Sequence, residues 1–93
     1  MLHKFKAEGA ELMRLGKEPS QGDMVSLEPG DGWDNVEAII AAFYVPGAKE
    51  DAYWCDSLGC AVPRHARSRR FEVAFVGVMP DGSTIETARC RVA

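Results

Sequence analysis

The sequence that decides the fold begins GDMVSLEPGDGW at residues 22–33, continues as the apolar run VEAIIAAFYV at residues 36–45, and ends AYWCD at residues 52–56. Most of the large side chains that can centre a small core lie in this stretch or in the hairpin that follows it. The chain has no phosphate-binding glycine loop, no Gly-x-Ser-x-Gly and no His-Glu-x-x-His. This stretch therefore gives more information about the fold than about the function.

Two structures fit residues 34–45. Met24–Glu28 before them is predicted to be a strand, and Pro29–Gly32 is a turn by composition. As a helix, residues 34–45 have Asp34 as N-cap with Glu37 at the capping-box spacing. As a strand, the same run is apolar on both faces and turns through residues 46–51 into a strand over residues 52–56. Periodicity does not decide between the two for so short a run.

The pattern Gly22-Asp23-x-Val25-x4-Gly30-x2-Trp33 resembles the opening of SH3-like small barrels. The same spacing occurs in type II, trimethoprim-insensitive dihydrofolate reductases, and the Asp31-Gly32-x-Trp-like turn is similar to that of Tudor-type barrels. The Val-Gln-Ile-Tyr active stretch of those reductases has no counterpart here, and no Tudor aromatic cage is evident. The resemblance implies a fold only.

Residues 2–15 are predicted to form a helix, since Leu2, Phe5, Leu12 and Met13 can share one face and Gly16 can end it. Phe71–Met79 and Thr84–Val92 are predicted to pair as strands about the turn at residues 80–83. The register that matches charges and apolar residues pairs Phe71 with Val92, Glu72 with Arg91, Val73 with Cys90, Phe75 with Ala88 and Met79 with Thr84.

The predicted fold class is therefore α+β. The N-terminal helix packs on an antiparallel sheet of about four or five strands, with an SH3-like, partly open barrel as the arrangement that the resemblance implies. A length of 93 residues predicts one domain, residues 1–93. No apolar run reaches the length of a membrane span, the first residues lack a signal-peptide core, and the cysteines number three. These features favour a cytoplasmic protein without a membrane partner or a disulfide framework.

Charge divides the chain into two parts. Residues 1–62 carry five Lys or Arg and eleven Asp or Glu, whereas residues 63–93 carry six Arg and three acidic residues. The densest cluster is a candidate site for an acidic protein partner, and its members are Arg64, His65, Arg67, Arg69 and Arg70. Nucleic acid is a less favoured partner because the net charge is −3. A solvated loop is the simplest interpretation of the same residues.

Three aromatic residues, Trp33, Tyr53 and Trp54, are a candidate ligand pocket, although such residues more often belong to the core. Cys55-x4-Cys60-x4-His65 contains zinc-ligand types at a spacing that is not typical of zinc knuckles. We therefore expect no metal site, no cofactor and no catalytic residue.

The sequence favours a small non-enzymatic protein-binding module that also self-associates as a homodimer. In the predicted register, Val76, Val78 and Ile85 form an apolar patch suited to the dimer interface. Compact domains without catalytic motifs are common in phages and mobile elements, so such an origin is a further expectation. The alternatives are a small-ligand protein or enzyme using the aromatic pocket, and nucleic-acid binding through the arginine cluster.

Overall fold

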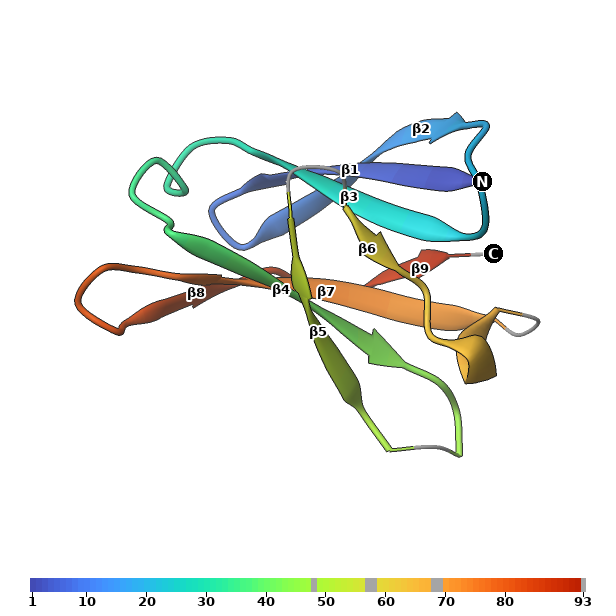
Figure 1. The fold of residues 1–93 in the computed structure, drawn as a ribbon. Coiled ribbons are helices and arrows are strands. Elements are labelled where there is room, and N and C mark those ends of the chain that lie inside the picture. The colour runs from blue at the N-terminus through green and yellow to red at the C-terminus, as the bar shows by residue number, and fades with distance from the viewer. Residues whose placement is uncertain (48, 57–58, 68–69, 93) are drawn as a thin grey trace.

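The computed structural model describes residues 1–47, 49–56, 59–67 and 70–92, and it consists of two β-sheets (Figure 1). The strands are β1 (Leu2–Glu8), β2 (Glu11–Glu18), β3 (Met24–Pro29), β4 (Ala38–Tyr44), β5 (Asp51–Cys55), β6 (Cys60–Ala61), β7 (Phe71–Val78), β8 (Thr84–Glu86) and β9 (Cys90–Val92). Sheet A has the order β2-β1-β3-β6, and sheet B has the order β5-β4-β7-β8 with β9 also paired to β7. Within the described residues, the only helical turn is the 3-10 turn η1 (Arg64–Ala66).

The helix predicted over residues 2–15 is wrong, and with it the α+β class. These residues form the β1–β2 hairpin, in which Phe5 and Ala7 are buried while Lys4, Lys6 and Glu8 lie on the opposite face. Gly9 has a φ of +56° and stands in the turn between the two strands. The alternation of period two and this turn outweigh the helical spacing of the apolar residues.

Within residues 34–45 the structure has a strand and no helix. Ala38–Tyr44 is β4, which pairs antiparallel with β5 on one side and with β7 on the other. Its inward side chains, Ala41 and Phe43, are buried in the core, while alternate residues such as Ile40 face the other side of the sheet.

The two sheets enclose one hydrophobic core. In Figure 1, β1 and β3 of sheet A lie above β4 and β7 of sheet B. Phe5 of sheet A meets Phe75 of sheet B with ring centroids 5.9 Å apart. Trp33 is 1% exposed and lies over Gly77, where an added Cβ would stand 2.7 Å from the indole ring. The absence of a side chain at Gly77 therefore leaves room for the indole ring between the sheets.

The predicted hairpin register is confirmed at the end far from the turn and wrong near the turn. Phe71, Glu72 and Val73 pair with Val92, Arg91 and Cys90, as predicted. Closer to the turn, Val78 pairs with Thr84 and Gly77 with Ile85, and the Thr87 N–H donates to the Phe75 carbonyl, so the Phe75–Ala88 and Met79–Thr84 pairs do not form. One extra residue in the second strand, a β-bulge near Thr87, causes this shift.

Candidate functional site

A groove opens where the two sheets separate. Asp56 and Gly59 exchange backbone hydrogen bonds of 3.4 and 3.1 Å, and from this pair β5 runs back into sheet B while β6 runs forward into sheet A. Figure 1 shows β5 and β6 diverging from that point. Between them lies a groove of about 520 Å³, which we call the β5 groove. Its lining residues are Met24, Tyr53, Trp54, Asp56, Gly59, Cys60, Ala61, Val62, Pro63, Arg64 and Arg67.

Two of the three predicted pocket aromatics line this groove. Tyr53 is 45% and Trp54 67% exposed, and as consecutive strand residues they point to opposite faces of β5. Tyr53 packs against Phe43 with ring centroids 6.1 Å apart. Trp33 lies elsewhere, in the core, where its indole N–H donates to the Gly9 carbonyl at 2.9 Å. Because side chains from both faces of β5 line the groove, the groove follows the free edge of that strand.

The predicted arginine cluster divides between two sites. Arg64 on η1 and the exposed Arg67 line the β5 groove, and the Arg67 Nε donates to the Val62 carbonyl at 3.0 Å. The His65 Nε2 lies 3.1 Å from the Asp51 Oδ2, which ties η1 to the start of β5. Arg70 lies at a different cavity. Arg69 lies outside the described residues.

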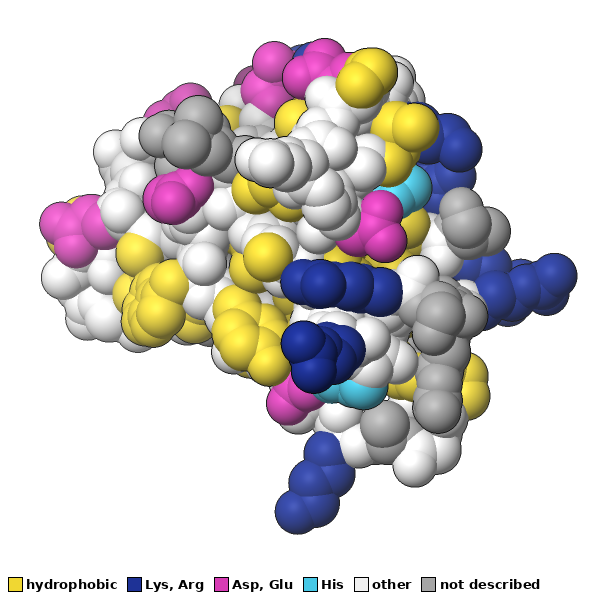
Figure 2. Space-filling view, turned by 45° about the vertical axis from the view of Figure 1, so that its right-hand side comes forward, with side chains coloured by type: hydrophobic (Ala, Val, Ile, Leu, Met, Phe, Trp, Pro, Cys, Tyr) yellow, Lys and Arg dark blue, Asp and Glu magenta, His cyan; other side chains and the backbone are white. Residues whose placement is uncertain are grey.

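In the view of Figure 2, hydrophobic side chains lie directly beside Lys and Arg side chains. This neighbourhood matters because an apolar contact and a guanidinium within one groove can recognise a protein segment that carries both apolar and acidic residues. Sequence reasoning treated the aromatic residues and the arginines as two separate sites. No local sequence signal links the aromatic residues to the arginines, because they come together only where the chain returns from β5 to η1.

The cavity that holds Arg70 has a volume of about 360 Å³ and also contains Arg89 and Arg91. The Arg89 guanidinium lies 3.6 Å from the centre of the Tyr44 ring, a cation–π contact. The Tyr44 hydroxyl donates to the Glu50 Oε1 at 3.1 Å, and burial together with this bond raises the Tyr44 pKa. Sequence reasoning missed this gathering, although the confirmed Glu72–Arg91 pairing was a partial signal for it.

The cysteines do not form a metal site with His65. Burial raises the pKa of the Cys55 thiol to about 12 and also raises that of Cys60, so both sulfurs are protonated at neutral pH. All three cysteines are free, and His65 pairs with Asp51 instead. Within the described ranges, no three His, Cys, Asp or Glu residues gather as metal ligands. A protonated thiol is a poor nucleophile and a poor ligand.

The patch predicted for self-association is only partly assembled. Val76 and Val78 lie on the outer face of sheet B, on the side away from the core, whereas Ile85 pairs with Gly77 and packs against the core. The bulge near Thr87 reverses the direction of Ile85 relative to the prediction. Strand pairing and alternation place a larger apolar set on this outer face: Ala38, Ile40, Ala42, Ala52, Trp54, Ala74, Val76 and Val78.

The search of family models, of curated proteins and of solved structures returns no match for this chain. The SH3-like resemblance therefore stays a prediction. In the part of the chain that the structure describes, no helix is long and apolar enough to span a bilayer.

Proposed function

We propose that this chain is a small non-enzymatic protein-binding module that holds an acidic partner in the β5 groove. The observation that carries the proposal is the position of an indole side chain that is 67% exposed at the free edge of β5, in a groove that also contains Arg64 and Arg67. Tryptophan and arginine are the residues most enriched at the energetic centres of protein interfaces. Their combination favours a partner segment with apolar and carboxylate side chains.

A protein partner is favoured over nucleic acid by the charges of the groove. Among the described residues that line it, the cationic ones are Arg64 and Arg67, and Asp56 lies beside them in the lining. Protein surfaces that bind nucleic acid generally carry a broader basic stripe, and this chain has a net charge of −3. The three free cysteines support a reducing compartment, and we place the module in the cytoplasm.

The test is a pull-down from extracts of the source organism followed by mass spectrometry. The charge variant is Arg64→Ser combined with Arg67→Ser, and the matched control is Lys17→Ser combined with Lys49→Ser, which removes the same charge from exposed positions outside the groove. We expect the wild type and the control to retain the same partner protein, and the arginine variant to lose it through slower association. Equal retention by the arginine variant contradicts the proposal. A captured component that nuclease removes favours nucleic-acid binding.

We also propose that the module self-associates through the outer face of sheet B. The support is the apolar character of this face, where Ile40 pairs with Trp54 on one side and with Val76 on the other. Water contact with such a continuous apolar face is costly, and a symmetric dimer is the commonest way to cover it.

Sedimentation of the wild type, Val78→Glu and Met13→Glu tests this dimer. Val78 lies on the outer face of sheet B, and the control residue Met13 pairs with Lys6 on the outer face of sheet A. We expect Val78→Glu to shift the wild-type dimer to monomer and Met13→Glu to leave it intact. A wild type that stays monomeric at high concentration rejects the dimer, as does a folded Val78→Glu variant that remains dimeric.

A further inference from the structure

Resting on the proposed function, we propose that the partner enters the β5 groove as an extended acidic segment and adds a strand to the free edge of β5. Strand β5 is the terminal strand of sheet B, with β4 on its other side. The backbone N–H and C=O groups that point away from β4 therefore face the groove. An extended chain placed there gains main-chain hydrogen bonds in addition to side-chain contacts.

The four edges of the two sheets differ in how they are protected against strand addition. The edge strand β2 has a register shift opposite Lys4 and Phe5, and it carries Glu11, Arg14, Lys17 and Glu18. The edge formed by β8 and β9 is interrupted by the bulge near Thr87 and flanked by Arg89 and Arg91. The edge strand β6 has only two residues. Bulges, charged residues and short strands are the usual means of blocking an exposed edge.

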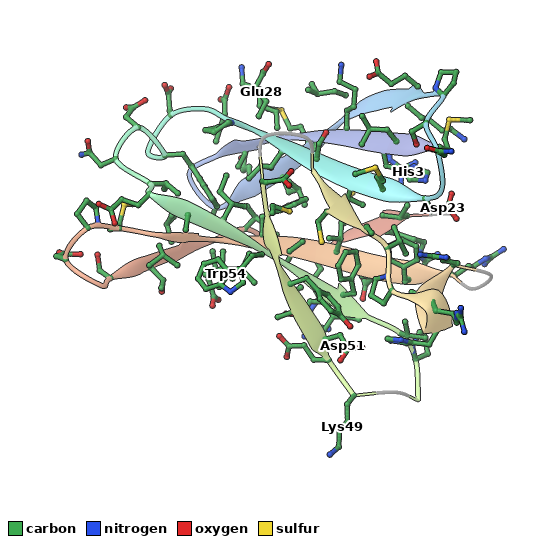
Figure 3. All side chains as sticks on the ribbon, viewed as in Figure 1. His3, Asp23, Glu28, Lys49, Asp51 and Trp54 are labelled. Atoms are coloured by element: carbon green, nitrogen blue, oxygen red, sulfur yellow. The ribbon has the colours of Figure 1, made fainter. Side chains whose placement is uncertain are left out.

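Strand β5 has none of these protections along its central residues. It pairs with β4 over five residues without a register shift, and it contains no Lys, Arg or Pro. Its only charged residue, Asp51, stands at its first position and is engaged by His65. Figure 3 shows Asp51 towards the end of β5 that follows Lys49 and Glu50, so the centre of the edge carries Ala52, Tyr53 and Trp54. Among the described edges, β5 is the one that is long, regular and uncharged at its centre.

The walls of the groove define the chemistry of the entering segment. Alternate residues of an added strand lie beside Trp54 on one face of the sheet and beside Tyr53 on the other, and both rings favour apolar side chains. Arg64 and Arg67 favour carboxylates through charge-assisted hydrogen bonds. The far wall is formed by residues of the 59–64 segment, so the space suits a single extended chain better than the whole sheet of a second copy.

The experiment uses a displayed library of random linear peptides selected against the intact chain. We expect the enriched peptides to alternate apolar residues with Asp or Glu, and to bind the Arg64→Ser, Arg67→Ser variant about tenfold or more weakly, because each charge-assisted contact is lost. Enriched peptides that lack acidic residues and bind this variant normally overturn the acidic segment.

Strand addition itself is tested by methylating the backbone nitrogens of the best peptide one at a time. We expect an alternating profile, since an N-methyl group that faces β5 removes a hydrogen bond and blocks close approach, while one that faces away does neither. The expected loss is on the order of tenfold at every second position and about twofold or less between them. A flat profile from a peptide that still binds the wild type more tightly than the Arg64→Ser, Arg67→Ser variant overturns strand addition while leaving the protein-binding function in place.

A second copy is the competing occupant. If two β5 strands pair antiparallel about a two-fold axis at Tyr53, a Tyr53→Cys chain forms an intermolecular disulfide that the selected peptide does not suppress. This outcome overturns the proposal. We expect no such cross-link in the presence of peptide. Failure to enrich any peptide while the pull-down still retains a partner also overturns strand addition, without affecting the proposed function.

Discussion

The outer faces of the two sheets differ in their chemistry. On sheet A, Lys4 lies 3.6 Å from Glu18, and Lys6 lies 3.3 Å from Glu8 and 3.9 Å from Glu28. On sheet B, alanine, valine and isoleucine occupy the middle of the outer face with Trp54 at the β5 edge, and Glu72, Glu86 and Arg91 share that face. Figure 3 shows Glu28 above sheet A and Trp54 below sheet B, pointing in opposite directions.

This difference indicates which of the two outer faces is suited to contact with water. Opposite charges on neighbouring strands satisfy one another and keep sheet A solvated. Water does not stabilise the apolar side chains on the outer face of sheet B. At the β5 edge this apolar surface continues into the groove that contains Arg64 and Arg67. Contacts with other molecules are therefore expected on sheet B and its β5 edge, and substitutions can separate this role from fold stability.

The largest effect is expected where the two sheets meet. Phe75 is completely buried and contacts Phe5 across the core, so Phe75→Ala should reduce the free energy of unfolding by roughly 3–5 kcal/mol. Urea unfolding measures this loss, with Val78→Ala on the outer face as control. A Phe75→Ala protein as stable as the control contradicts the assigned core.

A smaller effect is expected at the bulge of sheet B. The buried Thr87 accepts a hydrogen bond from the Phe75 N–H at 3.0 Å and donates to the Ala88 carbonyl at 2.9 Å. Thr87→Val leaves the Phe75 N–H without its partner, which should cost about 1–3 kcal/mol. The exposed Thr84→Val on β8 should change stability by less than about 0.5 kcal/mol. Equal stability of the Thr87→Val and Thr84→Val proteins contradicts a stabilising hydrogen bond between the Phe75 N–H and the Thr87 hydroxyl.

The bulge also explains how far the sequence could specify sheet B. The charge pair Glu72–Arg91 and the apolar matches beside it predicted the far end of the hairpin correctly. Nothing in residues 84–90 indicates that one residue is inserted, because the Thr87 hydroxyl replaces a backbone group in a way that only the three-dimensional contact reveals. The prediction for Ile85 failed for this reason alone.

The N-terminal residues show a different kind of failure. Leu2, Phe5, Leu12 and Met13 fit a helical face, yet Phe5 and Ala7 with Lys4, Lys6 and Glu8 fit a strand equally well. Gly9 was the deciding signal, since glycine in a turn is favourable and glycine in a helix is costly. For residues 38–44, the pairing with β5 and β7 is not encoded in the run itself, so periodicity left helix and strand open.

The candidate site was predictable in its parts but not in its assembly. Tyr53, Trp54, Arg64 and Arg67 were each recognised from the sequence. The groove that unites them depends on the Asp56–Gly59 pair, which reverses the chain between the two sheets. Gly59 has a φ of +108°, and an added Cβ would lie 2.5 Å from the Val25 carbonyl oxygen, so this reversal requires glycine.

The inner and outer sides of β5 should differ in their response to alkaline pH. The Cys55 thiol has a folded-state pKa of about 12 against an ordinary value of 9.0. Below about pH 9 the thiol is protonated in both states, whereas above it the unfolded chain loses the proton first, so stability should fall as the pH rises from 9 towards 12.

Unfolding measured at several pH values on either side of 9 checks this expectation, with Cys55→Ala beside the wild type. The fall should be smaller in the variant, with a remainder from Cys60 and Tyr44, whose pKa values are also raised. Trp54→Ser, on the opposite face of β5, should leave the slope unchanged. A slope that is identical in wild type and Cys55→Ala contradicts a buried protonated thiol.

The smallest effect is expected on the outer face of sheet A. Lys6 contacts Glu8 and Glu28, and its side chain is 32% exposed. Exposed ion pairs contribute about 0–1 kcal/mol, so Lys6→Gln should change the free energy of unfolding by no more than this. The small loss should shrink further at high salt, because screening weakens the pairs in the wild type.

The counterpart on sheet B is Val76→Thr. This substitution removes no charge, so its effect on stability should not depend on salt. Urea unfolding of the two variants at low and high salt measures both effects. If Lys6→Gln proves as costly as Thr87→Val, the charged face of sheet A contributes to holding the fold together, and its contrast with sheet B no longer separates a solvated face from a binding face.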